Sequence, residues 1–492
     1  MIFFVFQQPA LIYKSIYTIT EMDPLLQSIY GGVPSCQKFD NITLKRHQTK
    51  IADHMSKAKT RGALCWFSTG SGKSISALTV SRCLKLPTIM VMPGAVISSV
   101  HREIDRIEEF KDLENEIGVD VMTYGTFIND FLYDSKLVSG KLVILDEVQN
   151  FRSAGEETYK MIYAMSRAKK VLLLSATPLQ NEPSDIVAAL CMMDEDSRIG
   201  SIKSAEIYYK NRLRDFQEAL NDYEVERDPK PLEKLLKTHV SYFQAKNPDN
   251  DPNYPIVKHY MKKIDMSRDY YKAYEKIENN VRTGLPKQFR ASRDLTAFFN
   301  GLRRGSNHIN KISPKLKEII KLVLKFVAKK QKVVIYSAFQ DSGINIIRKA
   351  LKDKKIESVS VTGEESLTQK GLSVKLYNQN ESYVMLLTAA GAAGIDLKGS
   401  RALFITEPHW NSQLLHQVYG RVARYQSHTH LPETKQNVKI YTFILRKPPF
   451  IRERKDLDKS EKMSIDELVL SYANAKDARM NNFYKILKKV AL

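Results

Sequence analysis

The sequence predicts an α/β protein of two lobes, each a parallel sheet covered by helices. From Leu44 onward, short runs rich in aliphatic and β-branched residues alternate with amphipathic segments of helix length, and this alternation starts again in the second half of the chain. A chain of 492 residues is also too long for one ordinary core. Hydrophobic residues make up 43% of it, which is enough to fill two or three cores.

Strand candidates fall into two sets, one for each lobe. The region between the sets lacks regular strand alternation and contains the turn-rich residues 247–255, so it is expected to be a mostly helical insertion and connector. Ser464 suits the N-cap of a last helix, which is expected to pack on the second lobe. The clearest strand candidates are residues 88–92, 141–146, 170–176, 332–338, 357–363, 383–389 and 401–406.

These patterns predict five segments. They are an N-terminal extension at 1–40, a first lobe at 41–195, the helical insertion and connector at 196–310, a second lobe at 311–455 and the C-terminal helix at 456–492. The apolar opening residues lack a basic start and are interrupted by Gln7, Gln8 and Pro9, so neither a signal peptide nor a membrane span is expected. Residues 1–21 are expected to be an extension or a misassigned start, because a more ordinary sequence begins at Met22.

Charge and cysteine usage indicate the kind of partner and compartment. Lys and Arg number 76 against 55 acidic residues, and a formal charge of +21 favours a polyanion such as nucleic acid. The alternative is a generally basic, solvated surface. Four cysteines without a C-x-x-C pair are too sparse for a disulfide or zinc framework, so reduced, buried thiols in an intracellular protein are expected.

A phosphate-binding loop is predicted at residues 68–74, which read STGSGKS between an apolar run and a helix-like one. Glycines let backbone N–H groups close around phosphate oxygens. Lys73 would neutralise the β and γ phosphates of ATP or dATP, and Ser74 would ligate Mg²⁺. Phe67 stands where the full pattern has its first glycine. The predicted nucleotide-binding residues of the loop are Ser68, Thr69, Gly70, Ser71, Gly72, Lys73 and Ser74.

An acidic pair follows the apolar run that ends at Leu145. Asp146 can hold Mg²⁺, and Glu147 can activate the attacking water. A strand that ends in a solvated acidic turn is the alternative. The position of the pair, after the phosphate loop and before Ser-Ala-Thr at 175–177, favours the catalytic interpretation.

Residues 175–181, which read SATPLQN, indicate which class of ATPase the chain resembles. Ser-Ala-Thr is common to many nucleic-acid-stimulated ATPases, whereas TPLQN directly after it resembles the Swi/Snf-type translocases of superfamily II, which run on duplex DNA. The resemblance covers about residues 41–450 and implies two RecA-like lobes. The other matching segments, in order, are LKRHQ (44–48), VMPGAVISSVHREI (91–104), VMTYGTF (121–127), LDEVQNFRS (145–153), SPKLKEI (313–319), VVIYSAF (333–339), AAGAAGIDL (389–397), EPHWN (407–411) and QVYGRVARYQSH (417–428).

The resemblance implies further site residues. Gln48 would read the adenine edge, although a glutamine on a solvated helix start is the alternative. Arg421 and Arg424, with Gln417, would enter the ATP site from the second lobe, where an arginine stabilises the charge of phosphoryl transfer. An exposed basic helix is the alternative. Small residues around Gly394 and Asp396 would let the backbone approach the nucleotide or nucleic acid, or else form a buried tight turn.

A narrower resemblance points to viruses. DEVQNFRS, HVSYF (239–243), NYP (253–255) and RYQSH followed by LPETKQNVKIYTF (431–443) are similar to the nucleoside triphosphatase I and early transcription factor ATPases of large cytoplasmic DNA viruses. Two departures from the Swi/Snf group stand out: Gln149 replaces its usual His, and RYQSH replaces its usual R-I-G-Q. Because the carboxylates are kept, hydrolysis is expected, but its coupling to movement could be altered.

The sequence therefore predicts an ATP-driven motor stimulated by duplex DNA. The viral resemblance implies transcript release or assistance to RNA polymerase, in the virion and host cytoplasm. Expected partners are DNA and RNA polymerase or other transcription proteins. The alternatives are an RNA helicase and a DNA-binding transcription-factor subunit with little motor activity.

Overall fold

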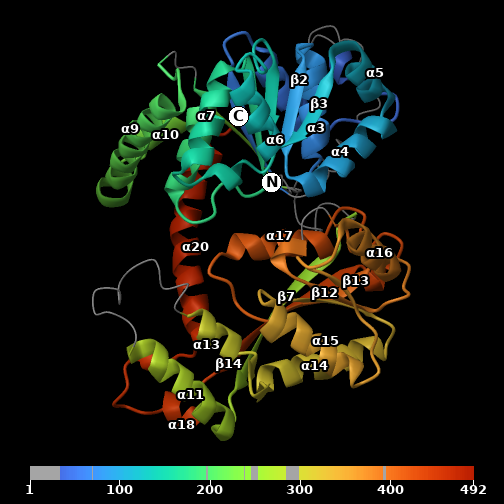
Figure 1. Ribbon diagram of the computed structural model, residues 1–492, viewed down its shortest axis with the longest axis vertical. Coiled ribbons are helices and arrows are strands. Elements are labelled where there is room, and N and C mark those ends of the chain that lie inside the picture. The colour runs from blue at the N-terminus through green and yellow to red at the C-terminus, as the bar shows by residue number, and fades with distance from the viewer. Residues whose placement is uncertain are drawn as a thin grey trace, which may run out of the picture.

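Two parallel sheets lie at the centres of two lobes, one above the other in the computed structural model (Figure 1). The structure describes residues 34–68, 70–194, 198–237, 239–244, 253–283, 299–391 and 395–492. Within these ranges each sheet has six strands. This architecture confirms the predicted α/β class with two RecA-like lobes.

The first sheet has the strand order β3-β2-β4-β5-β1-β6, and all its pairings are parallel. Helices cover both faces, so its strands read as continuous apolar runs rather than alternating ones. Its strands are β1 (Gly62–Phe67), β2 (Thr88–Met92), β3 (Val119–Thr123), β4 (Leu142–Leu145), β5 (Lys170–Ser175) and β6 (Val240–Phe243). Its helices are α2 (Arg46–Ser56), α3 (Lys73–Leu84), α4 (Gly94–Arg106), α5 (Glu108–Ile117), α6 (Tyr124–Tyr133), α7 (Glu156–Arg167), α8 (Val187–Met193), α9 (Ile202–Asn221) and α10 (Lys230–Leu236).

The second sheet has the order β11-β12-β10-β13-β14-β7, again with parallel pairings. The strands are β7 (Ile256–Asp265), β10 (Lys332–Tyr336), β11 (Val359–Val361), β12 (Val384–Leu387), β13 (Ser400–Ile405) and β14 (Asn437–Arg446). The helices around it are α11 (Arg268–Thr283), α13 (Asn300–Gly305), α14 (Pro314–Val327), α15 (Ile346–Lys352), α16 (Leu367–Asn378), α17 (Ser412–Val422) and α18 (Pro449–Arg452). The short strands β8 (His308–Ile309) and β9 (Lys311–Ile312) form a separate antiparallel pair.

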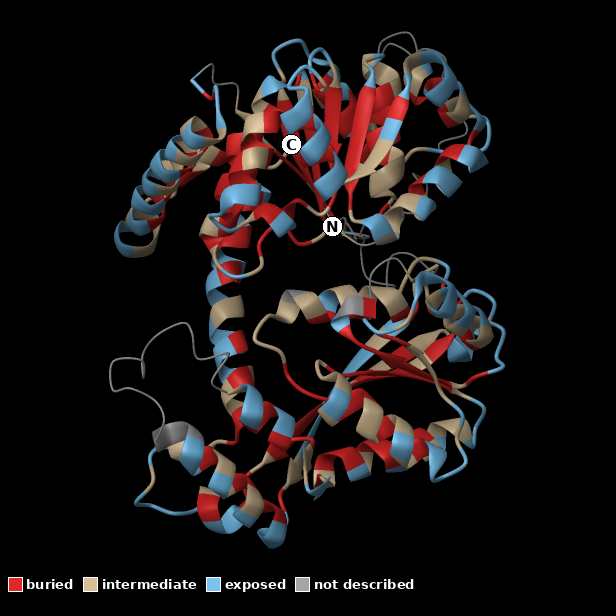
Figure 2. Cartoon of the chain, viewed as in Figure 1, coloured by how far each residue is buried: buried red, intermediate tan, exposed pale blue. Residues whose placement is uncertain are grey.

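Each sheet separates two apolar cores. Most strands of both sheets are buried between them (Figure 2). Along β1, Leu64 and Trp66 join the core under α6 to α8, whereas Cys65 and Phe67 join the core under α2 to α5. In the second lobe, β10 divides its side chains in the same way between the cores under α17 and α14. This alternation follows from the two-residue period of a strand.

The expected insertion at 196–310 differs from the structure in its strands. It does contain the helices α9, α10, α11 and α13, but β6 pairs with β1 in the first sheet, and β7 pairs with β14 along the edge of the second. Most of β7 is exposed, so it lacks the apolar alternation by which a strand is recognised. The turn-rich residues 247–252 lie outside the described part of the chain.

The last helix begins as expected but packs differently. After the short α19 (Lys459–Lys462), α20 (Ile465–Val490) starts at Ser464, whose side chain accepts the N–H of Glu467 in a capping box. Its first turns join a core of the second lobe through Ile465, while Phe483 near its end joins a core of the first lobe. The expectation that it packs on the second lobe was therefore incomplete, because α20 bridges both lobes (Figure 1).

The cysteines also correct an expectation. Cys36 and Cys83 form a disulfide that ties the segment before α2 to the end of α3. Cys65 and Cys191 are buried free thiols, as expected. The two bonded cysteines are 47 positions apart, and sequence spacing does not reveal that their side chains meet. Among the described residues, no helix is long and apolar enough to cross a membrane.

Candidate nucleotide site between the lobes

The phosphate loop lies between β1 and α3, as its sequence predicts. Gly70 and Gly72 have φ of 78° and 82°, in the left-handed region that favours glycine. A Cβ on Gly72 would come within 2.4 Å of Gln48 Nε2, so a side chain here would displace the Gln48 amide. Lys73 begins α3 and donates to the carbonyl oxygen of Phe67 at 3.3 Å. The helix N-terminus thus faces the loop, where phosphate binding is favoured.

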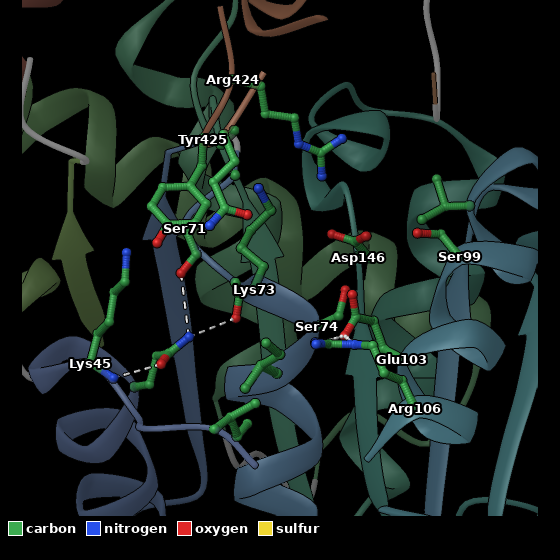
Figure 3. Close-up of a pocket in the computed structure, with 18 of the residues that line it drawn as sticks. Lys45, Ser71, Lys73, Ser74, Ser99, Glu103, Arg106, Asp146, Arg424 and Tyr425 are labelled. Carbon is green, nitrogen blue, oxygen red and sulfur yellow. Dashed lines mark hydrogen bonds and ion pairs between the residues drawn. The ribbon is translucent and has the colours of Figure 1, made fainter. Parts of the chain in front are cut away.

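A cavity of about 740 Å³ opens over this loop and is lined by both lobes. Figure 3 shows Asp146 on one side of Lys73, and Lys45 and Tyr425 on the other. Predicted site residues that line it are Gln48, Gly70, Ser71, Gly72, Lys73, Ser74, Asp146, Glu147, Gln417, Arg421 and Arg424.

The remaining predicted site residues are not among those that line the cavity. Ser68 is part of the loop, and its N–H donates to the carbonyl oxygen of Phe243, but its side chain does not line the cavity. Asp396 is close enough to act electrostatically on Arg421. Thr69 and Gly394 lie outside the described residues.

The acidic pair follows β4 in an unusual backbone conformation. Glu147 has φ of 52°, a left-handed conformation that side-chain-bearing residues rarely adopt and that is often found at functional sites. Burial, helped by the neighbouring Glu147, raises the pKa of Asp146 to about 7, while the ammonium of Lys73 opposes this shift. A divalent cation bound here would favour the ionised carboxylate.

Gln149 links the acidic pair to the next motif. Its amide nitrogen donates to the Glu147 carboxylate, and its amide oxygen accepts the hydroxyl of Ser175 at 2.6 Å. The Ser175 hydroxyl oxygen also accepts the N–H of Thr177 at 2.9 Å. The side chain that departs from the Swi/Snf pattern therefore joins the Glu147 carboxylate to Ser-Ala-Thr.

The residues present fit a nucleotide with Mg²⁺. Several buried polar atoms around the site have no hydrogen-bond partner among the described residues, and a ligand rich in oxygens could satisfy them. Ser74 and Asp146 supply the oxygens that Mg²⁺ prefers, and nucleotide phosphates and water would complete its shell. The unpaired atoms are Ser71 Oγ, Thr177 Oγ1, Asp396 Oδ1 and Arg421 Nε.

Sequence reasoning missed three side chains at the site. His47 stacks on Phe243 with ring centroids 3.6 Å apart, and its Nε2 lies 3.1 Å from the carbonyl oxygen of Ser71 in the phosphate loop. Burial lowers the pKa of His47 to about 4, which keeps the ring neutral. Tyr254 and Tyr425 approach the loop from the other lobe. LKRHQ and RYQSH contain His47 and Tyr425, but the residue types gave no sign of these contacts.

Gln48 is engaged within the protein. Its amide oxygen accepts the N–H of Lys45 at 2.7 Å, and its amide nitrogen lies 3.4 Å and 3.3 Å from the carbonyl oxygens of Ser71 and Gly72. These last two contacts are long, so little is lost if the amide turns toward a base. The structure brings Gln48 to the cavity and leaves its predicted contact with adenine as a prediction.

Family models match both lobes. The model described as an SNF2-related domain matches residues 41–358, more than half of the chain, and the helicase conserved C-terminal domain matches residues 314–426. The chain belongs to the SNF2-related family. This SNF2-related protein is thus an enzyme of the nucleic-acid-dependent ATPase and helicase class, a family that uses nucleotide and Mg²⁺.

The names of curated relatives include RNA helicases and a chromatin-remodeling factor. One Acanthamoeba polyphaga mimivirus protein, named as an ATP-dependent RNA helicase, is 27% identical over 91% of this chain and 97% of its own length. A second mimivirus protein with the same kind of name is 20% identical over 86% of this chain and 84% of its own. A CHD3-type chromatin-remodeling factor of Arabidopsis thaliana is 22% identical over 57% of this chain and 24% of its own.

Proteins of solved structure are less identical in sequence to this chain than these curated relatives are. The Sulfolobus solfataricus SWI2/SNF2 ATPase core in complex with dsDNA covers 92% of this SNF2-related chain and 98% of its own, at 16% identity and a TM-score of 0.38. The Pyrococcus furiosus Hef helicase domain covers 82% and 95%, at 14% identity and a TM-score of 0.46. Both TM-scores are below 0.5, so the family assignment rests on the sequence models.

Proposed function

We propose that this protein is a motor that hydrolyses ATP or dATP with Mg²⁺ and moves along duplex DNA. SNF2-related membership, the TPLQN segment and the net charge of +21 support this proposal. The charge favours a polyanionic track, while the family and TPLQN favour DNA as that track. Closing and opening of the lobes around the nucleotide would drive the steps.

The proposed catalytic roles belong to residues that line the cavity. Lys73 would hold the β and γ phosphates, and Ser74 with Asp146 would hold Mg²⁺. Glu147 would accept a proton from the attacking water. Arg421, with Arg424 and Gln417 nearby, would stabilise the charge of the transferred phosphoryl group from the second lobe.

The observation that carries the motor proposal is the hydrogen-bonded chain from Glu147 through Gln149 to Ser175. It continues into TPLQN, whose backbone and side chains contact the helix that bridges the lobes. The Tyr484 hydroxyl donates to the carbonyl oxygen of Leu179 at 3.3 Å, and Lys476 donates to the Asn181 side chain at 2.8 Å. A change at the hydrolytic carboxylate thus has a physical route to an element that both lobes hold, which favours a motor over a passive DNA-binding subunit.

The biological setting that we propose is transcription in a large cytoplasmic DNA virus. The similarity to a mimivirus protein over most of both chains supports a viral origin. Such a motor would release transcripts or assist RNA polymerase, and it would work in the virion and the host cytoplasm.

A second candidate is an RNA helicase, because the two mimivirus relatives are named so. Steady-state ATP hydrolysis separates the candidates when it is measured without nucleic acid, with duplex DNA, with single-stranded DNA and with RNA. Glu147→Gln serves as the blank. Stimulation by duplex DNA above the other nucleic acids supports the translocase, and stimulation by RNA above duplex DNA would replace it with the helicase. Hydrolysis no faster than the blank under every condition would contradict both.

A further inference from the structure

Tyr425 lies where the second lobe closes over the first. It follows α17 and lines the cavity together with Lys45 and Gln48. Figure 3 shows Tyr425 and Lys45 on the side of Lys73 away from Asp146. The ammonium of Lys45, from the first lobe, lies 4.8 Å from the centroid of the Tyr425 ring. A face of this ring is therefore directed toward a side chain of the opposite lobe within the cavity.

Two hydrogen bonds and a ring contact fix the turn that contains Tyr425. The Ser427 hydroxyl oxygen accepts the N–H of Arg424 at 3.1 Å, and the N–H of Gln426 donates to the carbonyl oxygen of Asn253 at 2.8 Å. The ring of Tyr254 packs edge-on against the ring of Tyr425, with centroids 5.6 Å apart. A ring that is fixed before the ligand arrives loses little entropy on binding.

The same turn covers the phosphate loop. An ideal Cβ at Gly70 would lie 3.5 Å from Arg424 Cγ and 3.8 Å from the Tyr254 hydroxyl. A nucleotide whose phosphates contact Lys73 would therefore share this cavity with Tyr425 and Gln48, which both line it. An aromatic ring and a side-chain amide are the two groups that recognise, respectively, the face and the edge of a nucleobase.

We propose that Tyr425 stacks on the base of the bound nucleotide and favours purines over pyrimidines, while Gln48 contacts the base edge. The base would take the ring face over which Lys45 lies. Stacking strength grows with the area of the π system, so a purine gains more than a pyrimidine. Because Tyr425 belongs to the second lobe, base binding would also hold the two lobes together. This inference rests on the proposed nucleotide-dependent function.

The test uses fluorescent 1,N6-etheno-ADP, whose emission is quenched when its base stacks on an aromatic ring. Tyr425→Ala is expected to weaken its binding about 10-fold and to remove the quenching, while Tyr425→Phe keeps both. Tripolyphosphate, which has no base, should compete equally well in wild type and both variants. The preference for ADP over CDP should shrink in Tyr425→Ala. Tyr133→Ala, at a tyrosine that is 95% exposed, is the matched control and should change nothing.

The results distinguish a failure of the Tyr425 proposal from a failure of the proposed nucleotide-dependent function. If the wild-type protein neither hydrolyses ATP nor binds etheno-ADP, the nucleotide-dependent function itself fails, and the inference with it. If wild type does both but Tyr425→Ala binds and quenches like wild type, Tyr425 does not contact the base. An equal loss of tripolyphosphate binding in Tyr425→Ala would mean that the ring only shapes the cavity, and this too would overturn the proposal.

Discussion

The Ser175 hydroxyl donates a 2.6 Å hydrogen bond to the amide oxygen of Gln149, and both residues are buried. The other end of the same amide donates to Glu147. A neutral amide can hold both partners at once because it has a donor and an acceptor, and its protonation does not change with pH. Gln149, which stands where the Swi/Snf group usually has His, therefore connects the two motifs.

Gln149→Leu should break the hydrogen-bonded connection between Glu147 and Ser175. We expect the hydrolysis rate to fall roughly 10- to 100-fold, the cost of leaving buried partners unsatisfied, while ADP affinity stays within about 3-fold of wild type. Ser175→Ala should have a smaller effect, because Gln149→Leu also removes the hydrogen bond to Glu147. The double variant should resemble Gln149→Leu, because both single changes remove the hydrogen bond between Gln149 and Ser175. Rates and ADP binding of all four proteins test this. Additive losses would show that the two residues act independently.

Substitutions of Glu147 and Lys73 should affect ATP hydrolysis and nucleotide binding differently. Glu147→Gln should lower ATP hydrolysis about 10²- to 10⁴-fold through loss of the general base, with ADP affinity nearly unchanged. Lys73→Ala should weaken nucleotide binding as well, because it removes the cation from the phosphate loop. Hydrolysis assays paired with ADP titrations distinguish the two. A Glu147→Gln protein with wild-type turnover would exclude Glu147 as the base.

The ion pair between Lys315 and Asp466 fastens α20 to the second lobe. Its N–O distance is 2.7 Å, and the two side chains are 0% and 2% exposed. Asp466→Ala should destabilise the protein by about 3–5 kcal/mol because it strands a buried ammonium, whereas Lys315→Met with Asp466→Leu should recover most of that loss. Glu206→Ala, which breaks the exposed pair with Lys210, is the control and should cost less than about 1 kcal/mol. Urea unfolding midpoints measure all of these, and equal loss in the single and double variants would contradict the explanation.

Reduction of the Cys36–Cys83 disulfide should loosen the first lobe. A crosslink across a sequence separation of 47 is expected to contribute about 4 kcal/mol through chain entropy. Thiol titration after unfolding should give two reactive thiols without reductant and four with it, since Cys65 and Cys191 are free. The urea midpoint should drop on reduction in wild type but not in the Cys36→Ser, Cys83→Ser double variant. Four thiols without reductant would rule the disulfide out.

His428 predicts a loss of stability in acid. Its Nε2 lies 2.7 Å from the carbonyl oxygen of Ser400, and burial lowers its pKa to about 4 from 6.5. The folded protein thus binds fewer protons than the unfolded chain, so this contribution is present above pH 6.5 and is lost as pH falls toward 4. The free energy of unfolding, from urea titrations between pH 7.5 and 4, should fall less steeply in His428→Gln, by up to about 1.4 kcal/mol per pH unit. Identical slopes would show that His428 does not titrate this way.

Much of the architecture could be predicted because it is encoded locally. The seven strand candidates all correspond to strands, and Thr88–Met92 matches in both bounds, because buried parallel strands read as continuous apolar runs. The loop that ends in Lys73 and the acids after β4 were placed from short motifs. Each motif occupies one strand-to-helix connection, so its local geometry follows from its own residues.

Other features depended on contacts between distant parts of the chain. β7 could not be recognised because an exposed edge strand has no apolar period, and only pairing with β14 makes it a strand. The meeting of Lys45 with Tyr425 and the bonding of Cys36 to Cys83 join residues that no spacing rule connects. The two-lobed α/β class and the position of the phosphate loop could be inferred from residue order alone, since periodicity and residue type are local properties. Which side chains meet around the cavity and how α20 spans the lobes follow instead from the packing of whole lobes against each other.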